Sequence, residues 1–176
     1  GALAEALVAV YAHQIKVQKN VVDTCALGFR INYCSTAVVQ HNRIYTTYYG
    51  CLAMYDCRGT ANTRCLVANN MMSNVGESTQ TNGALIQSCR YLDFVHNSLN
   101  ILSGSDDCKG LFLANSSRFI RIQNNSIVVR PGGLPVRRGP RRGRCRRARA
   151  AAAAAGARAR GTPRGWRPGR GSGRRR

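Results

Sequence analysis

The last 47 residues of this 176-residue chain contain no acidic residue. Residues 130–176 also lack Lys, Asn, Ile and Tyr, and 41 of them are Arg, Gly, Ala or Pro. Such a segment cannot bury an apolar core, so we expect it to be disordered. It holds seventeen arginines, whereas residues 1–129 hold ten basic and seven acidic residues. The formal net charge of +20 therefore describes the C-terminal segment more than the rest of the chain.

Long hydrophobic runs are also missing, because no stretch reaches the roughly 18 apolar residues that a membrane-spanning helix needs. No initiator Met and no signal-peptide pattern is visible, and we expect the chain to be an internal piece with further rungs, or a cap, before Gly1. The chain has no C-x-x-C pair, which argues against a zinc site. Seven cysteines precede residue 130 at irregular spacing, which is a poor disulfide framework. We predict buried free thiols that pack as small hydrophobic side chains.

A repeat is present instead, marked by an asparagine that recurs in one local frame. Apolar residues stand five and three positions before it and two positions after it, if Ala37 and Cys65 are counted as apolar. The five residues are Asn20, Asn42, Asn70, Asn97 and Asn125, at spacings of 22, 28, 27 and 28. A repeat of this length with two-residue alternation predicts a solenoid whose unit is one coil of strands.

The frame around Asn97 illustrates the predicted local structure. Leu92 and Phe94 alternate with Asp93, which is the periodicity of a strand. The alternation breaks before Asn97, and we place a bend there because Asn tolerates left-handed backbone geometry. In coils stacked about 4.8 Å apart, equivalent asparagines would form a ladder of hydrogen-bonded amides. The same register predicts that Asp93 and Arg121 are outward neighbours on adjacent rungs.

A second apolar segment precedes each bend, at residues 29–34, 52–57, 84–89 and 110–115. Glycines that we expect at corners stand at or just before these segments, at Gly28, Gly50, Gly83 and Gly110. The predicted fold class is therefore all-β: a right-handed, single-stranded parallel β-helix of about five rungs. We assign it to residues 1–131 and the disordered tail to residues 132–176. The first ten residues fit either a capping helix or the strand of a preceding rung.

With these rungs laid out, residues 13–129 resemble the right-handed parallel β-helix repeat proteins of the pectate-lyase-like superfold. The resemblance is carried by HNRIYTTYYG (41–50), LVANNMMS (66–73), HNSLNILSG (96–104) and KGLFLANSSRFIRIQNNSIVV (109–129). It is greatest to large secreted or surface-displayed members from Bacteroidota-type bacteria. The resemblance implies an extracellular or cell-surface location, and it is specific for fold rather than activity.

The resemblance ends near Val129, where relatives continue with a Gly-Gly-aromatic-Ala strand. This chain reads RPGGLPV and then changes to Arg, Gly, Ala and Pro, residues that G/C-rich codons encode. A frameshift at or near Val129–Arg130 explains the change, and a genuine arginine-rich arm is the alternative. Either form would bind nucleic acid and other polyanions non-specifically through residues 130–176.

One segment, SGSDDCKG (103–110), resembles the Gly-Asp-Asp-Cys segment of the polygalacturonase group of glycosidases. It offers Asp106, Asp107 and Lys109 as weak catalytic candidates. Glycoside hydrolysis needs two positioned carboxyl groups, and Thr81-Asn82-Gly83 has an amide where that family has an upstream acid. We favour a polar corner loop over a catalytic site.

A polysaccharide lyase is the other enzymatic reading. Lys109, Arg118 and Arg121 lie near Asp106 and Asp107 in the sequence, but calcium needs more oxygen ligands than two acids supply.

Glycan contact is the binding hypothesis, and it depends on Tyr45, Tyr48 and Tyr49, which we place in one loop, with Tyr33 and Tyr55 on flanking rungs. Tyrosine offers sugars an apolar face and a polar edge, although corner packing explains the same residues. His41 and His96 precede their rung asparagines, in a column with Lys19, Asn69 and Asn124, and we add both histidines to the binding candidates.

The predicted function is a non-catalytic extracellular scaffold or adhesion domain that contacts glycans. A fragment of a carbohydrate-active enzyme, a polysaccharide lyase or glycoside hydrolase whose catalytic rungs lie outside this sequence, is the alternative. Polyanion or nucleic-acid binding through the basic tail is the second alternative. We assign no cofactor and no metal site.

Overall fold

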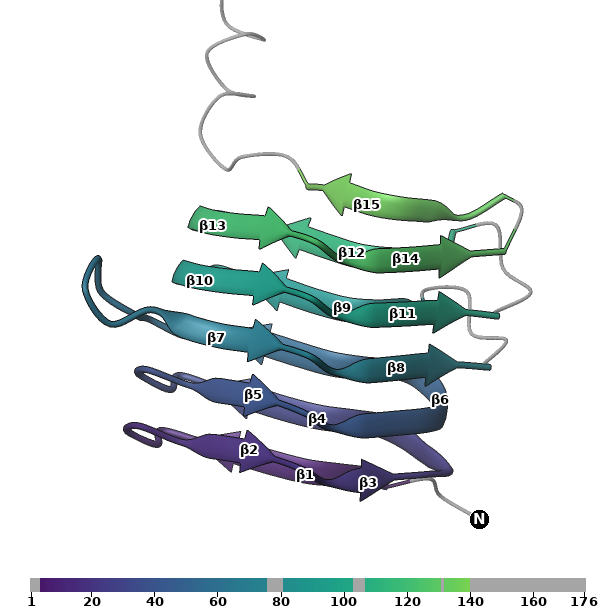
Figure 1. Cartoon of the computed structure of the whole chain (residues 1–176), viewed down its shortest axis with the longest axis horizontal. Helices are drawn as coiled ribbons and strands as arrows, with labels where there is room; N and C mark the ends of the chain where they lie inside the picture. Colours follow the sequence, from purple (N-terminus) through teal and green to yellow (C-terminus); the bar gives the residue numbers. More distant parts are fainter. Residues whose placement is uncertain (1–3, 76–80, 103–106, 131, 140–176) are drawn as a thin grey trace, which may run out of the picture. The chain divides into compact units, whose positions relative to one another are not determined.

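The computed structural model describes residues 4–75, 81–102, 107–130 and 132–139, and these residues form strands without any helix. All pairs between strands are parallel, and consecutive rungs stack along one axis (Figure 1). The predicted all-β parallel β-helix is therefore confirmed. The described residues contain no helix that could cross a membrane.

The strands form two hydrogen-bonded sheets. The smaller sheet contains β2 (Lys16–Gln18), β5 (Val38–Gln40), β7 (Cys65–Ala68), β10 (Arg90–Val95) and β13 (Arg118–Gln123). The larger sheet contains β1 (Glu5–Val10), β3 (Val21–Val22), β4 (Cys25–Asn32), β6 (Arg43–Tyr55), β8 (Met71–Asn74), β9 (Asn82–Gln87), β11 (Ser98–Ile101), β12 (Lys109–Ala114), β14 (Ser126–Val129) and β15 (Leu134–Arg138).

The larger sheet consists of two stacks that β6 joins, because this strand pairs with β8 over its first part and with β9 over its second. One stack runs through β3, β6, β8, β11 and β14, and the other runs through β1, β4, β6, β9, β12 and β15. Each full turn of the chain thus contributes to three stacks, where the repeat had predicted at least two strands per rung.

The core lies between the stacks and follows the predicted frame. Leu92, Phe94 and Leu99, the three apolar positions around Asn97, are all buried. The same positions on neighbouring rungs form one continuous cluster with the inward residues of β4, β6, β9 and β12. Because inward residues repeat along the axis, each rung covers the apolar face of the next.

The rung asparagines form a continuous row of hydrogen bonds. Asn42 donates its backbone N–H (3.0 Å) and its Nδ2 (2.9 Å) to Oδ1 of Asn70. The pairs that follow along the row, Asn70 with Asn97 and Asn97 with Asn125, repeat this geometry. The second Nδ2 hydrogen of Asn42 reaches the carbonyl of Val17, so the buried amide is satisfied.

Left-handed backbone geometry falls on the residue before each asparagine and not on the asparagine itself, so that part of the prediction is wrong. The residues with positive φ are Lys19, His41, Asn69, His96 and Asn124, at 53–57°. The asparagine turns inward because its amide must face the neighbouring rungs. The preceding residue absorbs the bend with its side chain in solvent.

The glycines also differ from the expected corner residues. Gly28, Gly50, Gly83 and Gly110 lie inside strands, and none of them has a positive φ. A Cβ at Gly83 would lie 2.6 Å from the Gly110 carbonyl oxygen and 2.6 Å from Cδ1 of Ile101. Glycine is required there because the stacks approach each other too closely for a side chain.

Each end of the described β-helix is a strand that pairs with the neighbouring rung. Residues 5–10 form β1, which pairs with β4, so the strand alternative for the first ten residues is confirmed. At the other end β15 pairs with β12 beyond the predicted boundary at residue 131. Arg-rich composition hid this strand, because Leu134 and Val136 alone provide its apolar alternation. The predicted disorder of residues 140–176 lies outside the described residues.

The register prediction for Asp93 and Arg121 is confirmed. Their Cα atoms are paired between β10 and β13, and Nε of Arg121 lies 3.7 Å from Oδ1 of Asp93. Sequence reasoning missed the closer partner, Arg64, whose Nε lies 2.6 Å from the same oxygen.

Candidate functional site

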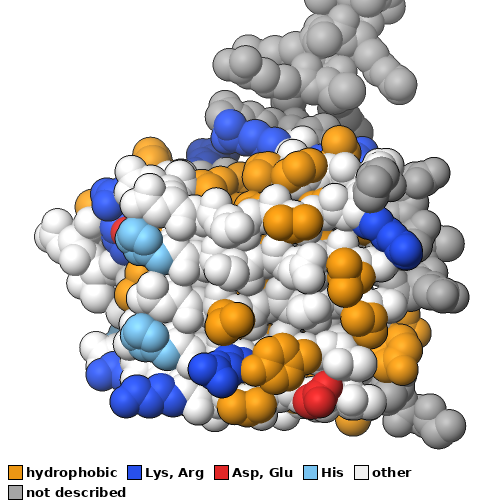
Figure 2. Space-filling model, turned by 45° about the vertical axis from the view of Figure 1, so that its right-hand side comes forward, with side chains coloured by type: hydrophobic (Ala, Val, Ile, Leu, Met, Phe, Trp, Pro, Cys, Tyr) orange, Lys and Arg blue, Asp and Glu red, His pale blue; other side chains and the backbone are white. Residues whose placement is uncertain are grey.

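One outer side of the β-helix carries a shallow hollow of about 260 Å³ above β8, β11 and β14. We call its outward-facing residues the serine face: Tyr45, Met71, Ser73, Ser98, Asn100, Ser126 and Val128. Figure 2 turns the right-hand side of Figure 1 forward and shows a largely uncharged surface with separated hydrophobic side chains. Hydroxyl, amide, aromatic and thioether groups are therefore presented together on a nearly flat surface.

The serine face is built by register. Ser98 pairs with Met71 on one side and Ser126 on the other, while Asn100 pairs with Ser73 and Val128. Equivalent positions repeat at the rung spacing of about 4.8 Å. Sequence reasoning missed these residues, although the repeated Asn-Ser pairs at Asn97-Ser98 and Asn125-Ser126 are a visible signal.

The three candidate tyrosines do not form one platform. Tyr45, Tyr48 and Tyr49 all belong to β6 and not to a loop, because this strand runs unbroken across the bend between two stacks. Tyr45 lines the serine face, whereas Tyr49 lines a separate hollow with Tyr55 and Leu85. Tyr33 lies elsewhere and stacks on Tyr11, with ring centroids 4.9 Å apart.

His41 and His96 are exposed and occupy equivalent left-handed positions two rungs apart. Each lies two residues before the first outward position of the next stack, Arg43 and Ser98 respectively. The histidines therefore border the serine face, with Asn69 between them. Two side chains on alternate rungs, about 10 Å apart, cannot act as one acid–base pair.

The acidic candidate Asp107 is held by two cations. Lys109 Nζ lies 2.8 Å from Asp107 Oδ1, and Arg137 Nη1 lies 3.1 Å from the same atom. The hydrogen bond and charge of Lys109, followed by Arg137, lower the pKa of Asp107, so its carboxyl group stays ionised. Lys109 is almost buried and also donates to the Asp107 carbonyl. Asp106 lies outside the described residues.

The remaining lyase candidates do not join this pair. Arg118 opens β13 in the smaller sheet and aligns with Arg90, and Arg121 pairs with Asp93. Asp107 and Lys109 instead stand at the start of β12 in the larger sheet. The described candidates lie in different stacks, so no base-and-calcium arrangement forms among Asp107, Lys109, Arg118 and Arg121.

Comparison with known families decides the classification. Residues 4–137 match the profile of the family described as "Periplasmic copper-binding protein (NosD)". The chain belongs to the NosD family. No curated protein and no solved structure shows significant similarity to the chain. The match spans all the described strands except the end of β15, so this NosD-family chain is a β-helix scaffold of a periplasmic family.

The NosD-family chain also contains a column of small inward side chains, all buried except the half-buried Ala12, at the corner before the smaller sheet. The column consists of Ala12, Cys34, Cys57, Cys89 and Ser117. Each thiol lies near two backbone carbonyl oxygens; the Cys89 Sγ, for example, lies 3.5 Å from the Met54 oxygen and 3.4 Å from the Gln87 oxygen. All seven cysteines of the described region are free and buried, as predicted.

Burial raises the pKa of most of these thiols, whereas the hydrogen bond with Cys89 lowers the pKa of Cys57. The hydrogen bond between Cys89 and Cys57, followed by burial, raises the pKa of Cys89 well above its ordinary value. Burial raises the pKa of Cys51, which lies in another stack, to about 12. Neither thiol is therefore a reactive nucleophile at neutral pH.

Proposed function

We propose that this chain is a non-catalytic scaffold outside the cytoplasm that binds glycans across the serine face. The observation that carries the proposal is the hollow in which the Tyr45 side chain lies beside hydroxyl and amide side chains from three consecutive rungs. Displayed at a cell surface, such a face would support adhesion.

The chemistry of the serine face matches a sugar chain. A tyrosine ring packs against the apolar face of a sugar while its hydroxyl reaches a polar edge. Ser98, Asn100 and Ser126 are exposed, and no hydrogen bond within the described residues uses their side chains. Because the rungs repeat, a linear glycan would meet equivalent donors and acceptors at regular steps.

Catalysis is not part of the proposal. Asp107 is the described member of the acidic pair, and two cations keep it ionised, which removes it as a general acid. A hydrolase would also need a second carboxyl group across the scissile bond.

The family description names copper, but the described residues do not fit a copper site. Across residues 4–75, 81–102, 107–130 and 132–139, His, Cys, Asp and Glu form no group of three that could hold a metal ion. Copper(I) favours thiolate ligands. Cys57 and Cys89 face backbone carbonyl oxygens, which accept hydrogen bonds from thiols and would repel thiolates.

Glycan binding is tested with the full chain on an array of neutral and charged oligosaccharides, followed by calorimetry on the best ligand. We expect Tyr45→Ala to weaken binding about tenfold or more, because ring stacking and the hydroxyl contact are both lost. Asn100→Ala should weaken binding less.

The matched control is Tyr33→Ala, which removes a more exposed tyrosine at another corner and should leave affinity unchanged. If Tyr49→Ala abolishes binding while Tyr45→Ala does not, the glycan occupies the Tyr49 hollow and the proposed face is wrong. Absence of any glycan ligand for the folded chain would refute the function itself.

A further inference from the structure

Three arginines occupy the same outward position on three consecutive rungs. Bridges pair Ser35 with Arg58 and Arg58 with Arg90, and the β10–β13 register pairs Arg90 with Arg118. We call Arg58, Arg90 and Arg118 the arginine file. We call the corner before the smaller sheet, which contains Cys34, Cys57 and Cys89, the thiol corner. The arginine file stands on the outer surface of this corner, away from the residues of the serine face.

The arginine file has no internal anion to neutralise it. All three arginines are exposed, and none forms an ion pair with another described residue. Asp93, three residues after Arg90 on β10, is already paired with Arg64 and Arg121. Asp56 is the remaining acid close to the file, and it lines a hollow with Arg58, Tyr33 and Ser35.

Like charges in register on neighbouring strands repel each other and destabilise a sheet. Their spacing of about 4.8 Å makes this repulsion appreciable even in water. Ser35 shows that an uncharged residue fits the same position. The stacked arginines therefore gain nothing within the fold and suit an external chain of negative charges.

Aromatic rings stand directly beside the file. Tyr91 and Phe119 follow Arg90 and Arg118, and their rings stack with centroids 4.6 Å apart and planes 10° apart. Phe119 is 60% exposed. Equivalent positions on the first two rungs hold Gln14 and Thr36, also with left-handed φ, so the corner geometry does not require aromatic residues. The rings add an apolar platform next to the cations.

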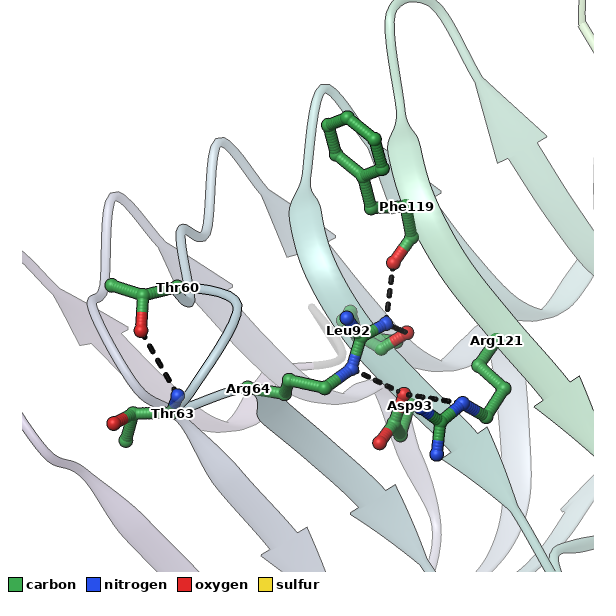
Figure 3. Close-up of polar contacts among 7 residues, drawn as sticks. All are labelled: Thr60, Thr63, Arg64, Leu92, Asp93, Phe119 and Arg121. Atoms are coloured by element: carbon green, nitrogen blue, oxygen red, sulfur yellow. Dashed lines mark hydrogen bonds and ion pairs between the residues drawn. The ribbon is translucent and has the colours of Figure 1, made fainter.

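Arg64 holds the backbone beneath this aromatic platform in place through hydrogen bonds. Its Nε reaches Asp93 at 2.6 Å, and its Nη2 donates to the carbonyls of Phe119 at 2.5 Å and Leu92 at 3.3 Å (Figure 3). The guanidinium carbon also lies 5.8 Å from the centroid of the Tyr91 ring. Carbonyl contacts on two successive rungs hold the corner in place before any ligand arrives.

We propose that the arginine file and the Tyr91–Phe119 stack form a second binding site, selective for linear acidic polysaccharides. The carboxylate or sulfate groups would pair with successive arginines, and the sugar rings would pack on the aromatic platform. Nucleic acid offers similar chemistry, but membership of a periplasmic family favours a glycan. The site shares no residue with the serine face, so its success or failure is independent of the function proposed above.

The test is arginine footprinting with phenylglyoxal, read by mass spectrometry on the full chain. Polygalacturonate is the acidic probe, dextran the neutral one, and polyphosphate the anion without sugar rings. We expect polygalacturonate to slow modification of Arg58, Arg90 and Arg118 about tenfold or more, while Arg138 reacts as before. Because each arginine is read separately, binding by the arginine-rich segment cannot produce this result.

Variants then test whether polygalacturonate binding depends on the arginine file or on the overall charge of the chain. Arg90→Gln with Arg118→Gln should weaken polygalacturonate binding, whereas Lys16→Gln with Arg138→Gln removes the same charge and should not. Phe119→Ala should weaken binding of polygalacturonate and spare that of polyphosphate. Equal losses in the two double variants, or equal protection by polyphosphate without any effect of Phe119→Ala, would overturn the proposal.

Discussion

The two corners that flank the smaller sheet solve the same bending problem with different chemistry. At the corner after the smaller sheet, which we call the amide corner, every rung places an asparagine inward. Each asparagine bonds to its neighbour through Oδ1. At the thiol corner the inward residue is Ala12, Cys34, Cys57, Cys89 or Ser117. A buried asparagine such as Asn42 uses both Nδ2 hydrogens and its Oδ1, which the single O–H donor of a serine or threonine cannot match, so the first position is fixed. The second position needs only a small side chain.

Both corners nevertheless share one backbone device. A residue with positive φ precedes the inward asparagine at the amide corner, and residues such as Tyr33, Tyr91 and Phe119 adopt the same geometry at the thiol corner. Left-handed geometry in bulky residues costs about 1–3 kcal/mol each. The repeated hydrogen bonds between rungs must therefore hold the chain in this conformation.

The largest expected effect comes from breaking the amide row at its centre. Asn70→Ala removes the acceptor for the backbone N–H and Nδ2 of Asn42, both buried. Stranding these donors should lower the free energy of unfolding by about 2–4 kcal/mol, measured by urea denaturation. Asn20→Ala, at the solvent-exposed end of the row, should cost about 1 kcal/mol or less. Equal losses would show that the row does not act through buried donors.

Alkaline pH should destabilise the fold through a buried thiol and leave the amide row unaffected, because amides do not titrate and thiols do. Burial raises the pKa of Cys51 from 9.0 to about 12, so the folded chain keeps a proton that the unfolded chain loses. Stability should therefore be level below pH 9.0 and fall by about 1.4 kcal/mol per pH unit for each such thiol until about pH 12. Urea midpoints measured from pH 8 to 11 test this, and Cys51→Ala should flatten the slope. An unchanged slope in that variant would contradict the assignment.

The smallest effect is expected at the thiol corner itself. Cys89→Ser should change stability by about 1 kcal/mol or less, because Ser117 in the same column already donates to the carbonyls of Ile86 and Ala114. Cys89→Leu should cost about 1–3 kcal/mol by overpacking. Thermal denaturation of both variants measures which of them is less stable. A serine variant as unstable as the leucine variant would show that sulfur is specifically required.

Sequence reasoning succeeded where one residue type repeats for one physical reason. The frame around Asn97 predicted which side chains are inward and that Asp93 meets Arg121. It was less reliable at Gly83, where glycine serves close packing between stacks and not a turn. It also placed Tyr45 in a loop, because periodicity could not show that β6 continues across a bend.

The candidate sites depend on neighbours that a linear pattern does not contain. Arg64 reaches Asp93 from a rung 29 residues earlier, and Arg137 reaches Asp107 from one 30 residues later. Neither separation follows the strand register, because Asp93 is paired with Leu66 and Arg137 with Phe112, so both arginines reach diagonally across to the neighbouring rung. A fixed repeat therefore could not predict these contacts.

By itself the sequence determined that this chain coils, since a recurring amide between alternating apolar residues can be satisfied only by stacking on copies of itself. The tertiary structure decided which outward residues meet. Outward side chains make no contribution to the core, so their partners follow from register and loop length. The serine face and the arginine file are consequences of that register.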